Sequence, residues 1–279
     1  MSTLCFNIGR KGLNSCKLSG SFPQLHHKVY CQQPEFPVYI REAALESSGS
    51  VMSAILSNWH RVRVDILKEE FVGHSTRFSR DNLFILVRFI TDAIKKVQKK
   101  PLQIIFPNIL LAARARNYFG SETIADVFID SLESMERKDN VRCVILVMPS
   151  SPDENDKWNN LYSMIVQQES LFYVLLNPQS RDNTEVGRFP HFSFQHYNGW
   201  KYYKSVYFLH SFVLDDICRI PMEVVVYKKH PFYCKLYYRP QKTTSMGSEW
   251  NTVEWNNFML PDIEEIVQLI HTKDTPYRI

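Results

Sequence analysis

Short runs of apolar residues alternate along the chain with longer stretches of helical periodicity. Strands are predicted at one stretch where apolar and charged residues alternate and at three nearly continuous apolar runs: 61–66, 102–106, 141–148 and 172–176. Between them, apolar spacing and start or stop signals predict three helices: 79–99, 109–119 and one that starts at Ser151. Alternation of strand and helix is typical of a parallel sheet covered by helices on both faces. Residues 59–180 are therefore predicted to form a mostly parallel, Rossmann-like α/β arrangement.

The last third of the chain has a different composition. Fifteen of the 50 residues from Phe189 to Tyr238 are aromatic, and the apolar runs here are joined by short connections. Aromatic and β-branched residues favour strands, and short connections favour antiparallel neighbours. We therefore expect residues 189–239 to form an aromatic-rich antiparallel β segment that extends or flanks the first sheet. Residues 240–251 are expected to be a polar loop, followed by a closing helix over 261–272.

The segment that precedes the first strand has no clear period. Residues 35–58 follow a proline, contain a second one at Pro37, and include the cluster Ser47–Ser50. Both features are turn and loop signals, so they predict an extended segment followed by a short helix or loop. Residues 59–272 are then predicted to be a single α/β domain, in line with the usual size of domains.

Charge is distributed unevenly and separates the first 34 residues from the rest. The chain has 33 Lys and Arg against 29 Asp and Glu, a formal net charge of +4. Residues 1–34 hold four of the basic residues and no acidic one, so the remainder has a net charge of zero. A basic leader with serines and without a continuous apolar core is typical of an organelle transit peptide, and its low arginine content favours the chloroplast. We expect cleavage near Cys31 and Gln32; a disordered basic tail is the alternative.

The neutral body argues against several classes of protein. Binding that tracks nucleic-acid phosphates needs clustered, uncompensated cations, so no nucleic-acid partner is expected. The longest clean apolar run, 143–148, is too short to span a bilayer. Cys143, Cys218 and Cys234 remain in the body without the spacing of a zinc site or a disulfide framework, so no metal is expected, and Cys143 is expected to be a core residue.

Polar residues follow three of the predicted parallel strands. They are Asn108, Ser150, Ser151, Asn177 and Gln179. Ligands of open parallel sheets bind beyond the carboxyl ends of the strands, so these residues form a candidate strand-end crevice. The same residue types are common helix caps and turn residues, and this structural role is the favoured one. Glycine-rich phosphate-binding motifs do not occur, so no cofactor and no catalytic residue is expected.

Aromatic side chains of the last third would suit a protein interface, because Tyr and Trp often carry much of the binding energy there. The candidates are Trp200, Tyr202, Tyr203, Tyr207 and Tyr237. One alternative is that they fill the core, and another is that they stack on single-stranded RNA beside neighbouring lysines. The neutral body favours the interior or an interface over RNA.

Several segments, taken in order, resemble those of one family. They are Arg61–Ile66, Ile104–Pro107, Asp130–Glu133, Val144–Pro152 and Val174–Gln179. Together with the leader they look like the plant, algal and cyanobacterial domain-of-unknown-function family that includes the low photosystem II accumulation 3 protein. The resemblance covers about residues 50–272, and the segments 208–212 and 229–232 depart from the family's glycine-rich pattern.

The resemblance implies a non-catalytic chloroplast factor, in the stroma or on the stromal face of the thylakoid, that assists assembly of photosystem II. It implies action on an inner-antenna chlorophyll protein. The expected partners are a core or antenna subunit of photosystem II or other assembly factors, with a peripheral contact to the thylakoid membrane. Two other function classes stay open: a small-molecule or nucleotide-using Rossmann-like enzyme, and an RNA-binding plastid protein.

Overall fold

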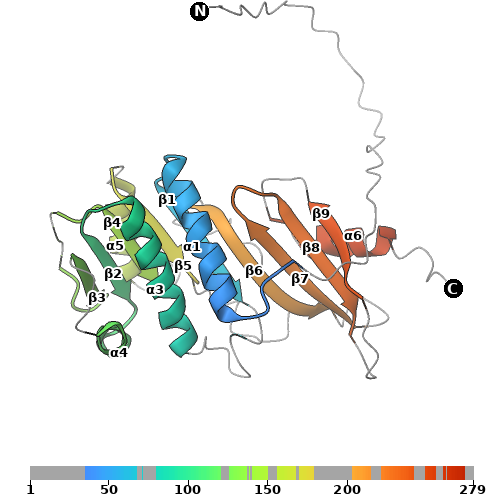
Figure 1. Ribbon diagram of the computed structural model, residues 1–279, viewed down its shortest axis with the longest axis horizontal. Coiled ribbons are helices and arrows are strands. Elements are labelled where there is room, and N and C mark those ends of the chain that lie inside the picture. Colours follow the sequence, from blue (N-terminus) through green and yellow to red (C-terminus); the bar gives the residue numbers. More distant parts are fainter. Residues whose placement is uncertain are drawn as a thin grey trace, which may run out of the picture.

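The structure, a computed structural model, describes residues 35–67, 71, 80–120, 126–136, 138, 140–149, 156–167, 170–178, 203–214, 221–241, 249–255, 260–261 and 263–273. The predicted leader 1–34, with its cleavage position near Cys31 and Gln32, lies outside these residues, as do Trp200 and Tyr202. The described segments form a nine-stranded sheet with helices on both faces (Figure 1).

The sheet has a parallel half and an antiparallel half. Its strands are β1 (Arg61–Leu67), β2 (Leu102–Phe106), β3 (Val127–Ser131), β4 (Cys143–Val147), β5 (Phe172–Leu176), β6 (Lys204–Leu214), β7 (Met222–Lys229), β8 (Cys234–Pro240) and β9 (Asn251–Trp255). The spatial order is β3-β2-β4-β5-β1-β6-β7-β8-β9, and the pairing is parallel from β3 to β6 and antiparallel from β6 to β9. The predicted fold class is confirmed. Because β6 pairs with β1 on one side and β7 on the other, both halves belong to one sheet.

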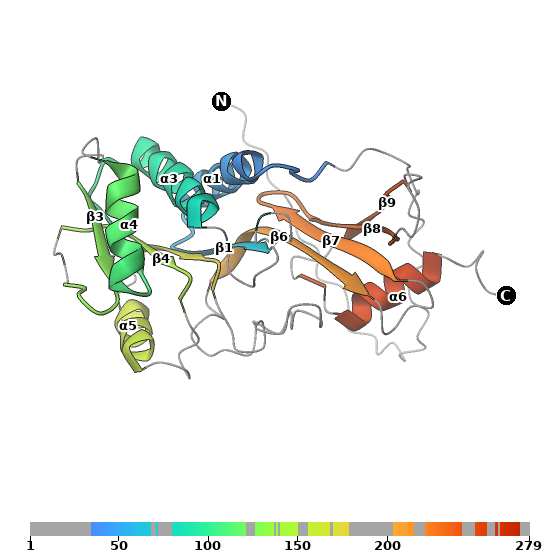
Figure 2. The ribbon, with the colours of Figure 1, turned by 90° about the horizontal axis from the view of Figure 1, so that it is seen from below.

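Helices cover both faces of this sheet. They are α1 (Ile40–Leu56), α3 (Arg80–Val97), α4 (Ile109–Phe119), α5 (Asp156–Gln167) and α6 (Ile263–Lys273). One core cluster joins α1, α3 and α4 to one face, whereas two separate clusters join α5 and α6 to the other face (Figure 2). Successive side chains of a strand point to opposite faces, so the apolar runs of the strands supply both core layers.

The ends of α3 and α4 follow from local signals. α3 ends ahead of Pro101 with Lys95 and Lys96 in its last turn, where the helix dipole favours cations. α4 ends at Gly120, whose φ of 71° lies in the left-handed region that suits glycine. The predicted helices 79–99 and 109–119 are confirmed to within two residues at each end.

The segment 35–58 differs from its prediction. Instead of an extended segment with a short helix or loop, it contains α1, a helix of 17 residues that packs beside α3 and over β6 (Figure 1). The serine cluster lies inside this helix, where Ser47 and Ser48 donate their hydroxyl groups to the backbone carbonyls of Ala44 and Leu45. Serines satisfied in this way are compatible with a helix interior, and their small size permits close packing.

The outer edge of the antiparallel half is also fixed by the segment before α1. Phe36 packs edge-on against Tyr237 and Trp250, with ring centroids 5.1 and 5.3 Å apart. Trp250 immediately precedes β9, a strand that the sequence pattern does not predict. The first described residues therefore contact the last strands of the sheet, although they are about 200 positions apart in the chain.

Candidate functional site

The structure describes two of the five residues of the predicted strand-end crevice, Asn108 and Asn177. Ser150, Ser151 and Gln179 lie outside the residues that the structure describes. Asn108 follows β2 and Asn177 follows β5, and β4 lies between these two strands in the sheet. The two asparagines therefore do not meet, and each makes hydrogen bonds of its own.

Asn108 caps the amino end of α4. Its backbone is extended, and its Oδ1 accepts a hydrogen bond from the backbone N–H of Leu111 at 2.9 Å. The first N–H groups of a helix have no acceptor within the helix, and an asparagine at this position supplies one. The structural role favoured from the sequence is therefore confirmed for Asn108.

Replacing Asn108 by alanine is expected to lower the free energy of unfolding by about 1 kcal/mol, because the N–H of Leu111 loses its acceptor. Asn108→Asp keeps an acceptor oxygen and should retain nearly the full stability. Urea denaturation measures both variants. An equal loss in Asn108→Asp and Asn108→Ala would contradict the capping role.

Asn177 extends the pairing of β5 with β1 past the end of β5. Its backbone turns away at a φ of 47°, a left-handed value that asparagine tolerates. Its Oδ1 accepts from the N–H of Ile66 at 2.8 Å, and its Nδ2 donates to the carbonyl of the same residue at 3.3 Å. The side-chain amide thus takes the place of the next strand residue. Asn177 is 1% exposed and is held within the sheet.

The central strand β1 carries a buried ion pair. The alternation at 61–66 predicts one buried face, yet Arg63 and Asp65 are only 6% and 1% exposed. The Nε and Nη2 atoms of Arg63 lie 2.7 and 2.9 Å from the two carboxylate oxygens of Asp65. The prediction of a half-exposed strand is therefore wrong, because the charges neutralise each other inside the protein. Burial raises the pKa of Asp65, and the Arg63 guanidinium opposes that shift.

His210 lies on the same face of the sheet as this ion pair. It is on β6, opposite Leu67 and two residues beyond Phe208, which is the register partner of Asp65. Burial lowers the pKa of His210 to about 3, so the ring is neutral at neutral pH. The imidazole packs against the rings of Phe208 and Phe212, with centroids 5.8 and 5.6 Å away. These residue types can serve catalysis, but here they pack as interior residues.

The described part of the chain contains neither a reactive thiol nor a cluster of metal-ligating side chains. Cys143 and Cys234 are buried and free, and burial raises the pKa of Cys234 to about 12 and that of Cys143 further still. Such thiols stay protonated and are poor nucleophiles, so the prediction of Cys143 as a core residue is confirmed. The described residues contain no group of three or more metal-ligating side chains. None of the helices among them is long and apolar enough to cross a bilayer.

Three of the predicted interface tyrosines belong to the interior. Tyr203, Tyr207 and Tyr237 are 8%, 0% and 2% exposed. The prediction that these three form a protein interface is therefore wrong, and the alternative that they fill the core is correct. The reason is that α1 and the segment before it cover the face of the sheet that carries Tyr207 and Tyr237.

Glu46 of α1 joins this helix to the aromatic strands. Its carboxylate accepts hydrogen bonds from the hydroxyl groups of Tyr207 at 3.2 Å and Tyr227 at 2.7 Å. Lys229 completes the arrangement with an ion pair at 3.0 Å. A single carboxylate thus satisfies two tyrosine hydroxyls and one ammonium group. No local sequence signal marks Glu46, because its three partners come from β6 and β7.

The outer side of α1 carries exposed apolar residues beside the exposed Arg41 and Glu42. Leu45 and Leu56 are 63% and 74% exposed, and Val38 and Tyr39, just before the helix, are 53% and 68% exposed. Leu45, the half-buried Met52 and Leu56 are spaced by seven and four residues, so they lie on one side of the helix. We call this side of α1, with Leu45, Met52 and Leu56, the outer face.

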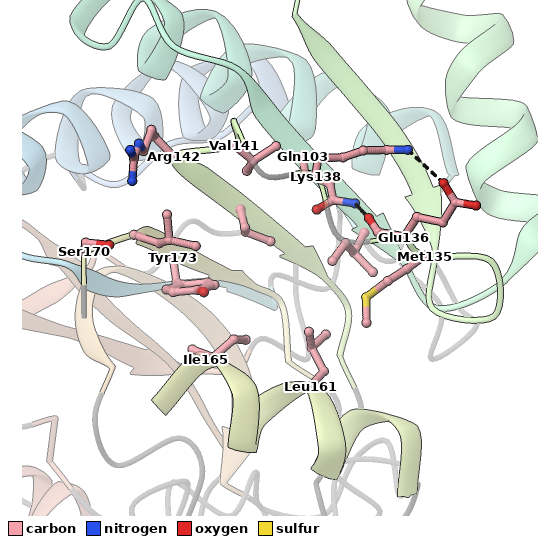
Figure 3. Close-up of a pocket in the computed structure, with 13 residues that line it drawn as sticks. Gln103, Met135, Glu136, Lys138, Val141, Arg142, Leu161, Ile165, Ser170 and Tyr173 are labelled. Carbon is pink, nitrogen blue, oxygen red and sulfur yellow. Dashed lines mark hydrogen bonds and ion pairs between the residues drawn. The ribbon is translucent and has the colours of Figure 1, made fainter. Parts of the chain in front are cut away.

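A recess of about 300 Å³ lies between α5 and the amino ends of β2, β4 and β5 (Figure 3). Leu161 and Ile165 of α5 face Tyr173 and the other apolar residues of the sheet across it (Figure 3). Gln103 lines its rim, but the side-chain amide of Gln103 already donates to Asp130 at 2.7 Å and to the carbonyl of Glu136 at 3.0 Å. The lining of the recess is thus mixed, polar and apolar, and the recess lies at the opposite end of the strands from the predicted crevice.

A second recess, of about 390 Å³, lies at the same end of the sheet on the α1 side. The carboxyl ends of α1 and α3 and the amino end of β5 enclose it. Arg142 and Ser170 line both recesses. We call this second one the cationic recess, because Lys99, Lys100 and Arg142 line it.

The sequence contains a signal for the ion pair of β1 but none for the cationic recess. Arg63 and Asp65 are two residues apart on one strand, so their side chains point to the same face and the pair is readable from the spacing. The residues of the cationic recess come from three separate connections, and only the sheet order brings them together.

Comparisons with known proteins give one match. A family model described as a domain of unknown function, DUF1995, matches residues 37–271. No curated protein and no solved structure matches the chain. The match begins before α1 and ends within α6, so it includes all the other helices and strands described above and most of α6. The chain therefore belongs to the DUF1995 family, a family of domains of unknown function.

Proposed function

We propose that the chain is a non-catalytic chloroplast factor that assists assembly of photosystem II, acting on an inner-antenna chlorophyll protein. The proposal rests on the basic leader and on the resemblance to the family that includes the low photosystem II accumulation 3 protein. It places the protein in the stroma or on the stromal face of the thylakoid. Its partners are a photosystem II subunit or another assembly factor.

The observation that carries the proposal is the outer face of α1. Leu45 and Leu56 are more than half exposed on a helix whose other side is packed against α3 and the sheet. Exposed apolar residues that lie in a row are typical of a protein-binding surface. Leu56 lies eleven positions after Leu45, which corresponds to a rise of about 16 Å along the helix axis. A surface of this length suits docking of an apolar helix of the client.

The other two function classes lose those of their residues that the structure describes. The enzyme alternative depended on the strand ends, where Asn108 caps a helix and Asn177 completes a strand pair. RNA stacking depended on exposed aromatic residues, and Tyr203, Tyr207 and Tyr237 are buried. None of these five residues favours either alternative over binding of a client protein.

Serine at both Leu45 and Leu56 is expected to abolish function with little loss of stability, because both side chains are exposed in the folded chain. The test is complementation of a line that lacks the protein, with photosystem II content as the readout. The matched control is Ile109→Ser with Leu110→Ser, which changes two leucine-sized residues of α4 that are 55% and 58% exposed.

Wild type and the α4 control should restore photosystem II, whereas the α1 variant should not. Co-purification of the inner-antenna protein from solubilised thylakoids should be lost in the same variant. Normal photosystem II content in the line without the protein would overturn the proposed function. Full restoration by the α1 variant would instead overturn the assignment of the surface.

A further inference from the structure

The cationic recess brings together three segments of the chain, two of which supply cations. Lys99 and Lys100 follow α3, Arg142 precedes β4, and His60 precedes β1. These segments meet because β1, β5 and β4 are neighbours, so their amino ends lie along one edge of the sheet. No Asp or Glu is among the described residues that line the recess.

The cations of the recess have no counter-ion within the described chain. In that part of the chain, no ion pair involves Lys99, Lys100 or Arg142. Elsewhere in the described helices and strands, several cations do have a specific carboxylate: Arg88 with Asp92, Lys229 with Glu46, Lys235 with Glu35 and Arg239 with Glu223. Cations that line one space without a counter-ion create a positive potential, which attracts an anion.

The positive field extends past the recess along the same edge. The Nζ atom of Lys204, at the start of β6, lies 4.5 Å from the ring centroid of Trp59, which lines the recess. The ring of His230 also packs against Trp59, and the two ring centroids are 4.2 Å apart. Burial lowers the pKa of His230, and the charges of Lys228 and Lys204 lower it further. Lys204 thus adds a further cation next to the recess.

Helix dipoles explain only part of this arrangement. Lysines near the end of α3 are favoured by its terminal carbonyl groups, and Lys95 donates to the carbonyl of Lys100 at 3.2 Å. Arg142 belongs to no helix. Its backbone is fixed by hydrogen bonds to Pro101 and Phe172, at 3.1 and 3.0 Å, while its side chain remains exposed at the recess. Its position is therefore set by the sheet and its charge is left available.

We propose that the cationic recess binds a ligand that carries a phosphate monoester on an apolar or aromatic body. Three cations around one space suit a group with more than one negative charge, and a phosphate monoester carries between one and two negative charges at neutral pH. The guanidinium of Arg142 provides paired donors for phosphate oxygens. Ile55, Val97 and Phe172 form an apolar wall for the rest of the ligand. The volume of about 390 Å³ lies within the range of small-molecule sites.

Calorimetric titration of the full chain with phenyl phosphate tests the proposal, and it is independent of the photosystem assay. Saturable binding is expected, and Arg142→Gln should weaken it about tenfold, the usual effect of losing a charge-assisted hydrogen bond. Lys99→Gln should weaken it as well. Lys96→Gln is the matched control, because this exposed lysine lies three residues earlier and does not line the recess; it should bind like wild type.

A second arm distinguishes a soluble phosphate ester from a lipid headgroup. The full chain is sedimented with phosphatidylcholine vesicles that do or do not contain phosphatidic acid. If the ligand is a lipid headgroup, the chain should bind the phosphatidic acid vesicles, and Arg142→Gln should reduce this binding. If the ligand is soluble, Arg142→Gln should weaken the binding of phenyl phosphate only. The basic leader is the same in wild type and variant, so it cancels in the comparison. Equal binding by wild type and Arg142→Gln in both arms, or no binding in either, would overturn the proposal.

Discussion

Replacing Arg63 by methionine is expected to destabilise the fold by about 3–5 kcal/mol, the usual cost of leaving a buried charge without its partner. The methionine fills much of the same space, so the loss reports mainly on the carboxylate of Asp65, which is 1% exposed. Guanidinium chloride denaturation, followed by circular dichroism, measures the change in the free energy of unfolding.

The pH dependence of the Arg63→Met variant gives an independent check. Burial already raises the pKa of Asp65, and removal of Arg63 takes away the charge that opposes this shift. A folded-state pKa above the unfolded value means that folding takes up a proton, so stability rises as the pH falls. The variant should therefore regain part of its loss at mildly acidic pH.

The matched control for this ion pair is the double variant Arg63→Met with Asp65→Leu. Without the carboxylate there is no buried charge to compensate, so most of the stability lost in Arg63→Met should return. A double variant that is less stable than Arg63→Met would contradict the assignment of the loss to an unpaired charge. So would a stability of Arg63→Met that does not change with pH.

Replacing Glu46 by leucine is expected to cost about 2–4 kcal/mol, because two tyrosine hydroxyls and one ammonium group lose their acceptor together. Tyr207 is fully buried and Tyr227 is 7% exposed, so water does not readily replace the carboxylate. The loss should also loosen α1 from the sheet. Hydrogen exchange of α1 amides, measured with the stability, should show faster exchange in this helix than in α5.

Two further variants make the Glu46 result specific. Glu46→Gln keeps an acceptor oxygen for a tyrosine and should lose less than Glu46→Leu. Glu35→Gln removes an ion pair with Lys235 in which the Glu35 side chain is 59% exposed, and exposed pairs contribute less than about 1 kcal/mol. Equal losses in Glu46→Leu and Glu35→Gln would show that Glu46 is no more than a surface ion pair.

The parallel half of the fold is predictable because its signals are local. An apolar run such as 172–176 is too short for a helix and too apolar for a strand with one exposed face, so it indicates a strand buried on both faces. Asn108, Gly120 and Pro101 mark helix ends through backbone preferences that operate wherever the chain lies. The antiparallel half follows in the same way from short connections between aromatic strands.

The errors arise where burial depends on a distant part of the chain. The serine cluster of α1 is typical of a loop, and it is helical because α3 and the sheet pack against its small residues. Tyr207 and Tyr237 resemble interface residues in the sequence, and they are buried because α1 and Phe36 cover them. One amino-acid sequence does not show which of its residues will be covered by a distant segment of the chain.

The sequence by itself determined the order and type of most elements, the caps of α4 and the position of β1 as a strand, because periodicity and backbone preference act over a few residues. The tertiary structure alone decided which charges are buried and which distant charges come together. Arg63 and Asp65 compensate each other inside the sheet, and Glu46 binds three partners from two strands. Lys100 and Arg142 line one recess that has no carboxylate among its described residues. These outcomes depend on the sheet order β4-β5-β1-β6, which sets the distances between residues that are far apart in the chain.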